Sequence, residues 1–585
     1  MSSETNGTLS ADAANRRICV IGGGCAGLAA AYYLKKHARN ELTVTLLESG
    51  SRLGGHANSI NIGEGQDAVL VDTGFMVYNT VNYPHLCGLF DSLGVEGIPT
   101  DMGFSVSMDS ASFEWCADTV RGLFATPMNL FRPSFYIMIW DIFRFNSKAK
   151  EFLKLPLSDP LKDGNMRDFL SRNRLSDAFV NYYLVPMTAS IWSATSDDML
   201  NFPALTLLTF LDNHLLLQTR HNISWMTPRN RSLEYVNKIA DMLGDSVKLN
   251  KSVVKVTRKP GTLNCTGCVL VEDANGFVSE YDDVVFACHP DQILQMIEED
   301  NNSAKIEKDT LRAFKYSNND VYVHKDRSLM PKNHSAWTSW NYIGQSSKNS
   351  RPVFVTYWLN KLQSLQTKLD VFVSLNPVNL PRADLTYTKM LYSHPQFSLD
   401  AILAQNLVRA ELQGKNHTYF AGAWLGYGFH EDGIKSGLEA AVGINGVPLP
   451  DSWTGPPRPR TILSSTKGAM ANLNNSRGLL AWISSFTRRL FSPFLNILNY
   501  ASEESIFYFL SKGFRKGMLH FKCPNGKVRS LGTIPSENDL TIIVNDARFF
   551  SRVALEYDLG LSRSFIAGGK IHYYSIAYSI KYIFL

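Results

Sequence analysis

The first strong pattern in the chain is a short apolar run that ends in glycines and leads into a helical segment. Residues 17–21 read Arg-Ile-Cys-Val-Ile, the glycine-rich segment 22–27 follows, and residues 28–36 have the Ala-rich spacing of a packed helix. A second β-rich run, residues 42–47, ends at Glu48. Strand, helix and strand in this order predict a βαβ unit.

The pattern then changes character. Residues 75–230 have mostly helical periodicity and many aromatic residues. Short alternating runs further on predict strands at 247–257, 267–272, 277–287, 321–324, 353–358 and 371–375. An apolar run at 419–422 and a helical pattern at 433–442 predict a late strand and helix.

Beyond Gly446 the sequence becomes rich in Pro and then in Ser, Thr and Asn, which is typical of a linker. Apolar residues recur at helical spacing between Leu479 and Ile497, with Arg488 and Arg489 alongside. This segment is either the docking helix of a second domain or an amphipathic helix at a membrane surface.

Composition and charge restrict the class of protein. The 585 residues are 45% hydrophobic and 19% charged, which indicates a multi-domain globular chain. Residues 451–585 hold 17 Lys and Arg against 8 Asp and Glu, whereas the rest is slightly acidic. We therefore expect no nucleic-acid partner, and a peripheral contact of the basic C-terminal part with an anionic membrane.

Cysteine spacing and the N-terminus bear on location. The eight cysteines have no regular spacing, and the isolated pair Cys265 and Cys268 reads as a coincidence in a strand and turn. Residues 1–17 lack the apolar core of a signal peptide, and no uncharged run has the length of a membrane span. These observations predict a cytoplasmic protein, possible peripheral membrane contact and no metal site.

The glycine-rich segment carries the first functional chemistry. Gly22 permits a tight turn, Gly24 lets the backbone approach a pyrophosphate, and Gly27 lets helix and strand pack closely. Glu48 ends the second strand, where a carboxylate accepts hydrogen bonds from an adenosine ribose and repels a 2′-phosphate. The sequence therefore predicts a dinucleotide site that binds NAD or FAD.

Two features favour FAD. Glu48 is followed by Arg52, Gly54 and Gly55, which supply a basic side chain and flexible backbone for a longer cofactor. A second glycine-bearing strand and helix, residues 422–441, would bring another helix N-terminus to the far end of an extended dinucleotide.

The motifs at 48–55 and 422–441 resemble those of the flavin-containing amine oxidase and phytoene desaturase superfamily. The Gly-Gly-His-Ala-Asn of residues 54–58 and the segments 71–79, 286–291, 337–342 and 427–433 are similar to one of its branches. The resemblance covers residues 16–445. It implies non-covalent FAD, with Val254 as a backbone contact to adenine and Gly433 and Ile434 beside the flavin ring.

These arguments and the resemblance together give a set of predicted FAD-binding residues: Gly22, Gly24, Cys25, Ala26, Gly27, Glu48, Ser49, Arg52, Gly54, Gly55, His56, Thr73, Gly74, Val254, Gly422, Asp432, Gly433 and Ile434. The family commonly has an acid directly after the late-strand glycine, where this chain has Ala423, so Asp432 is the candidate for that contact. Where relatives often have a Gly-Gly pair, this chain has Arg229 and Arg231, which either contact phosphate or lie in a solvated turn.

Residues 500–569 resemble the N-terminal subdomain of cyclopropane-fatty-acyl-phospholipid synthases. The similarity rests on 548–561 and 564–568 and stops after Gly569, with no later glycine loop for S-adenosylmethionine. We therefore expect no methyltransferase activity and a truncated domain.

The predicted fold is α/β, a Rossmann-like FAD-binding domain with an interleaved α+β substrate (cap) domain and a short C-terminal α+β fragment. The expected boundaries are 16–75 with 228–300 and 403–446 for the FAD-binding domain, 76–227 with 301–402 for the cap, 447–478 for the linker, 479–570 for the fragment and 571–585 for the tail.

The leading functional hypothesis is an FAD-dependent oxidoreductase acting on an apolar, fatty-acyl or phospholipid-linked substrate. The alternatives are a flavin amine oxidase and a non-catalytic, FAD-stabilised partner of a lipid-modifying enzyme. His430 and Glu431 are the candidates for proton transfer, with structural capping as their other possible role.

Overall fold

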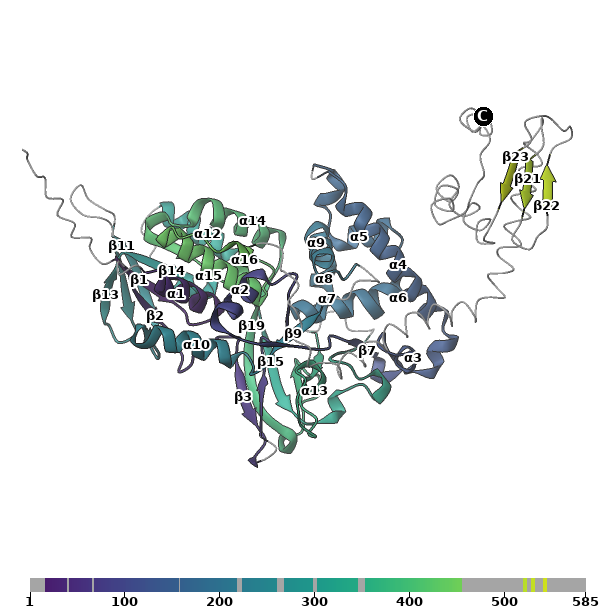
Figure 1. Ribbon diagram of the computed structural model, residues 1–585, viewed down its shortest axis with the longest axis horizontal. Coiled ribbons are helices and arrows are strands. Elements are labelled where there is room, and N and C mark those ends of the chain that lie inside the picture. The colour runs from purple at the N-terminus through teal and green to yellow at the C-terminus, as the bar shows by residue number, and fades with distance from the viewer. Residues whose placement is uncertain are drawn as a thin grey trace, which may run out of the picture. The chain divides into compact units, whose positions relative to one another are not determined.

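The structure is a computed structural model that describes residues 16–38, 42–65, 68–156, 158–217, 224–259, 268–297, 302–345, 353–454, 519–522, 528–531 and 540–543. The chain divides into two compact units, Met1–Leu463 and Ser464–Leu585. Figure 1 shows the elements of the first unit along the chain.

A parallel sheet forms the centre of the nucleotide-binding part of the first unit. Among the described residues its strand order is β10-β2-β1-β14-β20, and every neighbouring pair is parallel. The strands are β1 (Arg16–Ile21), β2 (Leu42–Leu47), β10 (Val247–Lys248), β14 (Asp283–Phe286) and β20 (Thr418–Phe420). The predicted α/β fold with a Rossmann-like core is confirmed.

The two faces of this sheet belong to different hydrophobic cores. Along β1, Ile18 and Val20 pack on one side, whereas Cys19 and Ile21 pack on the other. Because neighbouring side chains point to opposite faces, a strand buried on both sides has to be apolar throughout, which explains the continuous apolar run in the sequence.

Helices cover the first face and a small antiparallel sheet with helices covers the second. The helices of the first face are α1 (Cys25–Lys36), α2 (Pro84–Leu93), α10 (Leu233–Leu243), α15 (His430–Asn445) and α16 (Asp451–Thr454). The second face carries β11 (Val253–Lys259), β12 (Cys268–Asp273), β13 (Val278–Tyr281), α11 (Pro290–Met296), α12 (Asn302–Arg312) and α14 (Leu399–Leu407).

Two strand predictions are corrected here. The run 247–257 divides into β10 and β11, which belong to different sheets. The run 277–287 forms two strands, because β13 pairs antiparallel with β12 whereas β14 pairs parallel with β1. Asp282 lies between them and its backbone N–H donates to the Arg17 carbonyl. The pair Asp282 and Asp283 was the sequence signal for this break, because an interrupted apolar run favours a turn.

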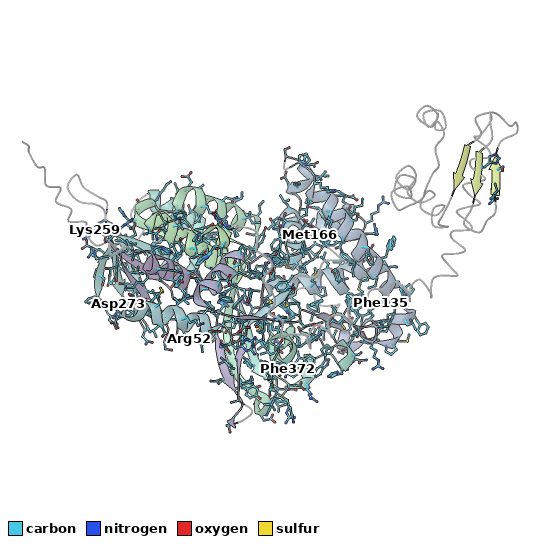
Figure 2. The ribbon with its side chains drawn as sticks, viewed as in Figure 1. Arg52, Phe135, Met166, Lys259, Asp273 and Phe372 are labelled. Atoms are coloured by element: carbon cyan, nitrogen blue, oxygen red, sulfur yellow. The ribbon has the colours of Figure 1, made fainter. Side chains whose placement is uncertain are left out.

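The cap contains a mixed sheet with the order β19-β15-β18-β17-β16-β7-β8 among the described residues. Its strands are β7 (Phe104–Met108), β8 (Phe113–Cys116), β15 (Lys315–His324), β16 (Trp340–Gly344), β17 (Val355–Trp358), β18 (Phe372–Leu375) and β19 (Thr386–Gln396). Phe372, in β18, is labelled in this sheet in Figure 2. The expectation that 75–230 is mostly helical missed β7 and β8, which pair with partners more than 200 residues away or with each other.

The remaining cap elements are helical, and smaller strand pairs connect the two parts. The helices are α3 (Val120–Leu123), α4 (Pro133–Leu153), α5 (Met166–Arg172), α6 (Asp177–Phe179), α7 (Val185–Trp192), α8 (Ser196–Asn201), α9 (Ala204–Asn213) and α13 (Leu359–Leu362). The smaller strands are β3 (Ser59–Ile62), β4 (Val69–Asp72), β5 (Tyr78–Asn79), β6 (Gly97–Pro99) and β9 (Trp225–Pro228).

Residues 447–454 pack onto the nucleotide-binding part and do not begin the linker. The Trp453 side chain of α16 is buried, and a Cβ placed on Gly88 of α2 would lie 2.4 Å from the indole. The first residues of the predicted linker 447–478 therefore belong to the packed unit. The other domain boundaries stay predictions.

Within Ser464–Leu585 the structure describes β21 (Leu519–Lys522), β22 (Val528–Leu531) and β23 (Leu540–Ile543), in the order β22-β21-β23. The predicted helix at 479–497, the motifs at 548–568 and the tail 571–585 lie outside the described residues, as does Cys265. In the part of the chain that the structure describes, no helix has the length and apolarity needed to cross a membrane.

Candidate cofactor and active site

The glycine loop between β1 and α1 has the geometry of a pyrophosphate cradle. A Cβ on Gly27 would lie 1.9 Å from the Gly22 carbonyl oxygen, so the helix can approach the strand only without a side chain there. Gly22 has φ +110°, and a Cβ on it would lie 2.6 Å from the Ala287 carbonyl oxygen. By contrast, no heavy atom lies within 4 Å of a Cβ placed on Gly24. The backbone is therefore tight behind the loop and open in front of it, as a bound phosphate requires.

Glu48 joins the end of β2 to this loop. Its Oε2 accepts a hydrogen bond from the Gly23 N–H (2.7 Å), and its Oε1 accepts one from the Gly50 N–H (2.7 Å). The neighbouring Ser49 hydroxyl donates to the same Oε1 at 3.3 Å. Because each carboxylate oxygen has two lone pairs, Glu48 retains acceptor capacity for the ribose hydroxyls.

The Gly54–Gly55 turn lies against the glycine loop. The Gly54 N–H donates to the Gly23 carbonyl (2.8 Å), and Gly24 forms a parallel bridge with Gly54. Both turn glycines have positive φ, and a Cβ on Gly55 would lie 3.2 Å from the Gly24 Cα. The Arg52 guanidinium donates to the Gly55 carbonyl (2.9 Å) and so braces the turn; Figure 2 labels Arg52.

The late segment meets the early one at the N-termini of α15 and α1 (Figure 1). A Cβ on Gly433 would lie 2.5 Å from Cys25 Sγ, and one on Gly437 would lie 2.1 Å from the Ala26 carbonyl oxygen. Ile434 is fully buried in the same core. Two stretches more than 400 residues apart in sequence thus form one site.

Gly422 and Asp432 shape the loop that precedes α15. The Gly422 N–H donates to Ser436 Oγ (2.8 Å) on the first turns of the helix. Asp432 Oδ2 accepts hydrogen bonds from the backbone N–H groups of Tyr427 (3.0 Å) and Phe429 (2.9 Å). Burial raises the pKa of Asp432 to about 7, and these N–H donors partly offset that effect. Asp432 therefore orders loop 426–429, whether or not it also contacts the cofactor.

Cys25 lies at a helix N-terminus, a position that commonly lowers a thiol pKa. Here desolvation outweighs the backbone donors and raises the pKa of the Cys25 thiol to about 12. The thiol is therefore protonated and packs against Gly433 rather than acting as a nucleophile.

Thr73 and Gly74 pack against the segment that follows the Gly54–Gly55 turn. A Cβ on Gly74 would lie 2.3 Å from the His56 carbonyl oxygen, so the two loops touch backbone to backbone. Thr73 Oγ1 donates to the Asn58 carbonyl (2.9 Å) and shares a hydrogen bond with the Tyr392 hydroxyl (2.7 Å). This contact links the nucleotide-binding part to β19 of the cap.

An imidazole cluster lies between the two parts and was not visible in the sequence. The His56 ring lies 4.8 Å from the Tyr392 ring and 5.5 Å from the His394 ring, between centroids. His289 stacks on Tyr316 at 4.3 Å and lies 6.4 Å from His56. No local spacing reveals this cluster, because its members come from a turn, from the end of β14 and from two cap strands.

Desolvation keeps these imidazoles uncharged. It lowers the pKa of His394 to about 4, lowers that of His289, and lowers that of His56 well below its ordinary value. His56 Nε2 is buried without a hydrogen-bond partner. An orphaned ring nitrogen beside the open front of the glycine loop fits a site built for a cofactor. Among the described residues, no group of His, Cys, Asp or Glu side chains has the arrangement of a metal site.

The two catalytic candidates have different surroundings. Glu431 Oε1 accepts hydrogen bonds from His85 Nδ1 (2.7 Å) and the His85 N–H (3.0 Å), and its Oε2 accepts one from the Leu86 N–H (2.9 Å). A carboxylate over the first N–H groups of α2 is a helix-capping group, so this geometry supports the structural alternative for Glu431.

His430 lies deeper. Its ring stacks on Phe75 at 3.9 Å, and its Nε2 hydrogen-bonds the Tyr235 hydroxyl at 2.7 Å. Desolvation lowers the pKa of His430 to about 3. A pKa this low makes the His430 imidazole a weak base, and burial raises the pKa of the Tyr235 phenol well above its ordinary value, so this hydrogen bond positions the ring. The role of His430 in proton transfer stays a prediction.

Three further predicted positions lie away from the glycine loops. Val254 lies in β11 with its side chain 44% exposed, which leaves only its backbone for a cofactor contact. Arg229 forms an exposed ion pair with Glu96 (2.7 Å), which is the solvated alternative predicted for it. Arg231 is buried and donates to the Leu70 carbonyl (3.1 Å).

An aromatic wall borders loop 426–429 on the cap side. Phe210 of α9 stacks on Phe429 at 5.2 Å and contacts Trp192 of α7 at 4.6 Å between ring centroids. Tyr427 lies 5.5 Å from Phe210, and its carbonyl accepts a hydrogen bond from Trp192 Nε1 (3.2 Å). Tyr427 and Phe429 precede Gly433 and Ile434 by only four to seven residues in sequence.

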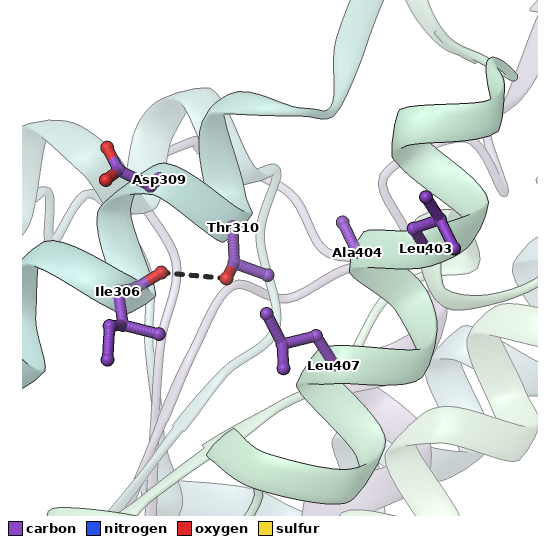
Figure 3. A pocket seen from close by; sticks show the side chains of 6 residues that line it. All are labelled: Ile306, Asp309, Thr310, Leu403, Ala404 and Leu407. Atoms are coloured by element: carbon purple, nitrogen blue, oxygen red, sulfur yellow. Dashed lines mark hydrogen bonds between the residues drawn. The ribbon is translucent and has the colours of Figure 1, made fainter.

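A separate hollow of about 350 Å³ lies between α12 and α14 (Figure 3). Its lining residues are Ile306, Asp309, Thr310, Leu403, Ala404 and Leu407. None of them is a predicted site residue. The Thr310 hydroxyl already donates a hydrogen bond to the Ile306 carbonyl (2.7 Å). We assign this hollow no part in the cofactor site.

The comparisons with known proteins agree with this geometry. The family described as flavin containing amine oxidoreductase matches residues 25–314. None of the curated proteins matches the chain.

Solved structures share the fold at low identity. Cyclohexylamine oxidase from Brevibacterium oxydans IH-35A is 15% identical with a TM-score of 0.54, over 74% of this chain and 99% of that one. Putrescine oxidase bound to putrescine is 16% identical with a TM-score of 0.53, over 74% and 99%. A CLA-producing fatty acid isomerase from P. acnes is 14% identical with a TM-score of 0.51, over 73% and 97%.

The residues at the glycine loops fit FAD, and the family match begins at the first residue of α1. The chain is therefore an FAD-dependent oxidoreductase, similar over residues 25–314 to the flavin containing amine oxidoreductases.

Proposed function

We propose that this flavoenzyme oxidises or reduces an apolar, fatty-acyl or phospholipid-linked substrate. The observation that carries the proposal is the character of the surfaces around the predicted flavin contact. Tyr427 and Phe429 lie there with their rings packed on the buried Phe210, and the nearest imidazoles are uncharged.

The electrostatics favour a neutral substrate over a protonated amine. Desolvation lowers the pKa of His430 to about 3 and that of His214, which stacks on Phe210, to about 4. The same environment would penalise an ammonium group. The adjoining carboxylates of Glu431 and Asp432 already accept backbone hydrogen bonds, which reduces what they can offer a cation.

A fatty-acyl substrate is supported by one neighbour and by one sequence resemblance. The P. acnes protein of the same fold is a CLA-producing fatty acid isomerase. The segment similar to a phospholipid-modifying enzyme lies at 500–569, largely outside the described residues. Substrate class therefore rests chiefly on the aromatic wall and the uncharged imidazoles.

FAD, when bound, supplies two-electron transfer. The glycine loop would hold its pyrophosphate, Glu48 its ribose, and the start of α15 its ring end. The Tyr235 hydroxyl holds the His430 ring in place through Nε2, and the aromatic wall excludes water from the reacting atoms. The cap and the nucleotide-binding part together orient the substrate.

The experiment compares molecules with the same alkyl chain and different head groups. Oxidised flavoprotein is mixed anaerobically with a saturated fatty-acyl ester, its phospholipid counterpart or the matching alkylamine, and the flavin absorbance is followed. Reduced flavoprotein is mixed with the corresponding unsaturated acyl compounds. The proposal predicts a response to acyl compounds in one direction and none to the amine.

The second candidate, a flavin amine oxidase, is favoured by the family match and by the two amine oxidases of the same fold. Flavin reduction by the alkylamine, without a response to acyl compounds, would establish it and end the lipid proposal. A flavin that exchanges electrons with neither class would support the third hypothesis, a non-catalytic partner of a lipid-modifying enzyme.

A further inference from the structure

A group of large apolar side chains is exposed at one end of the cap, over residues 128–143. Phe131 is 73% exposed and Trp140 is 66% exposed, which is far beyond the usual exposure of such residues. The exposed members of this group, called the 128–143 surface, are Met128, Leu130, Phe131, Ile137, Trp140 and Phe143. Adjacent exposed apolar groups of this kind mark a contact with another surface.

The surface is not a by-product of how α4 packs. Phe135, Met138 and Phe145 lie on the buried face of this helix, and Figure 2 labels Phe135 there. A surface helix normally has polar residues on the opposite face, and the last turns of α4 do, with Ser147 and Lys148. The first three turns carry apolar residues on both faces. The exception is therefore local to residues 128–143.

Basic residues flank this surface. Residues 121–154 contain 6 Lys and Arg against 2 Asp and Glu. Both acids are engaged, because Asp141 pairs with Arg144 and Glu151 pairs with Lys148 (2.7 Å). The excess positive charge comes from side chains such as Arg121 and Lys154, which are exposed. An apolar ridge beside a basic rim is complementary to a layer with an apolar interior and a negative surface.

We propose that the 128–143 surface inserts into the interface of an anionic lipid bilayer. Trp and Phe are well suited to the boundary between head groups and acyl chains, and nearby Lys and Arg gain from anionic lipids. A second copy of the chain fits less well. A two-fold interface places each patch on its own equivalent, so the basic rims would face one another and repel.

The test uses the full-length flavoprotein and sedimentation with vesicles. One set is phosphatidylcholine alone and the other contains about one third phosphatidylglycerol, so that only the second attracts basic side chains. Phe131→Ser, Trp140→Ser and Phe143→Ser are combined in one variant. It should bind the anionic vesicles about 100-fold more weakly than the parent, because three aromatic side chains are lost from the interface. Its thermal stability should be unchanged, since the replaced side chains are exposed.

A matched control distinguishes binding through this surface from non-specific binding by any exposed apolar residues. Leu391, Leu399 and Leu403 are also exposed apolar residues, but they lie on β19 and α14. Changing these three to Ser should leave vesicle binding as it is in the parent. Equal losses in the two triple variants would overturn the proposal.

Two other results would also overturn it. If the parent does not bind anionic vesicles, or binds them as well after the 128–143 changes, the contact lies elsewhere or does not exist. If those changes convert a dimer to a monomer in light scattering without affecting vesicle binding, the surface is an interface between copies. Insertion itself predicts that bromine-labelled acyl chains quench part of the tryptophan fluorescence, and that Trp140→Phe removes this part.

Discussion

The nucleotide-binding part and the cap of this flavoenzyme differ in the kind of contact that packs each of them. In the first, backbone meets backbone: a Cβ on Gly27 or Gly437 would lie within about 2 Å of a carbonyl oxygen. In the second, aromatic side chains fill the space, as Phe210 does between Trp192 and Phe429. Backbone contacts leave no room for any side chain, whereas side-chain contacts allow substitutions of similar volume. The two parts should therefore respond differently to small changes.

The largest effect is expected from Gly27→Ala. The new Cβ would lie 1.9 Å from the Gly22 carbonyl oxygen, and neither β1 nor α1 can shift without disturbing the sheet. We expect a loss of more than about 4 kcal/mol in the free energy of unfolding. Soluble yield and denaturant unfolding measure it.

Gly24→Ala is the matched control, because nothing lies within 4 Å of its Cβ and its φ is an ordinary −73°. Its stability should change by less than about 1 kcal/mol. The affinity for FAD should nevertheless fall at least about tenfold, because the methyl group occupies the approach of the pyrophosphate. Unchanged FAD affinity would show that the pyrophosphate does not lie over this loop.

In the cap, Phe210→Ala should cost about 3 kcal/mol, because it leaves a cavity beside Trp192 and Phe429. Phe210→Leu keeps most of the volume and should cost only about 1 kcal/mol. Urea unfolding of the two variants gives both values. If the Leu variant were as damaging as the Ala variant, the cap would be as intolerant as the glycine contacts, and the comparison would fail.

A smaller effect is expected from Glu431→Gln, which removes a charged cap from the N-terminus of α2. The loss should be about 2 kcal/mol, since the amide keeps only part of the hydrogen bonding to His85 and Leu86. The control is Glu439→Gln on the exposed side of α15, the helix that carries Glu431. It should cost less than about 0.5 kcal/mol. Thermal unfolding measures both, and the rate of flavin reduction in folded Glu431→Gln protein should equal that of the parent. A stable variant with no flavin reduction would instead make Glu431 catalytic.

The smallest predicted effect is a difference in acid sensitivity. Burial lowers the pKa of several imidazoles, to about 4 for His214, His324 and His394 in the cap. Unfolded histidines titrate near 6.5, so below that pH the unfolded chain binds more protons and stability falls as pH decreases towards 4.

The nucleotide-binding part contains buried carboxyl groups whose effect on the pH dependence of stability is opposite to that of the imidazoles. Burial raises the pKa of Asp432 to about 7 and that of Asp72 to about 6, so these carboxyls add stability as pH falls from 7 towards 4. His56, His289 and His430 in this part act like the cap imidazoles and partly offset the two carboxyls. We therefore expect the cap to loosen first in acid, as followed by hydrogen exchange between pH 7 and 5. His324→Asn should flatten the pH dependence of Tm, and an unchanged slope would contradict the assignment.

The two parts also differ in how much the sequence revealed. The turn at Gly22 to Gly27 and the acid at Glu48 were predictable because each depends on residues near in sequence. The late glycines at 433 and 437 were found from a second local motif. The meeting of the two motifs follows from the parallel sheet, which a βαβ pattern implies.

The cap could not be predicted in this way. β7 lies in a region of helical pattern, and it is a strand because it pairs with Trp340 and its neighbours more than 200 residues away. His56, His289 and His394 have no common spacing, and they meet only because a turn, the segment after β14 and cap strand β19 come together. The capping role of Glu431 depends on α2, nearly 350 residues earlier. Non-local pairing decides each case, so no window of sequence contains the information.

The strand order β10-β2-β1-β14-β20 has a consequence for how this protein folds during its synthesis. Cys25 emerges from the ribosome early, but its partner Gly433 is synthesised after the whole cap. A nascent chain thus carries an unfinished nucleotide pocket and unshielded apolar strands for most of its translation, a state in which chaperones are commonly needed. Cofactor capture is therefore a late event in biogenesis, and FAD can stabilise only chains that have been translated beyond this point.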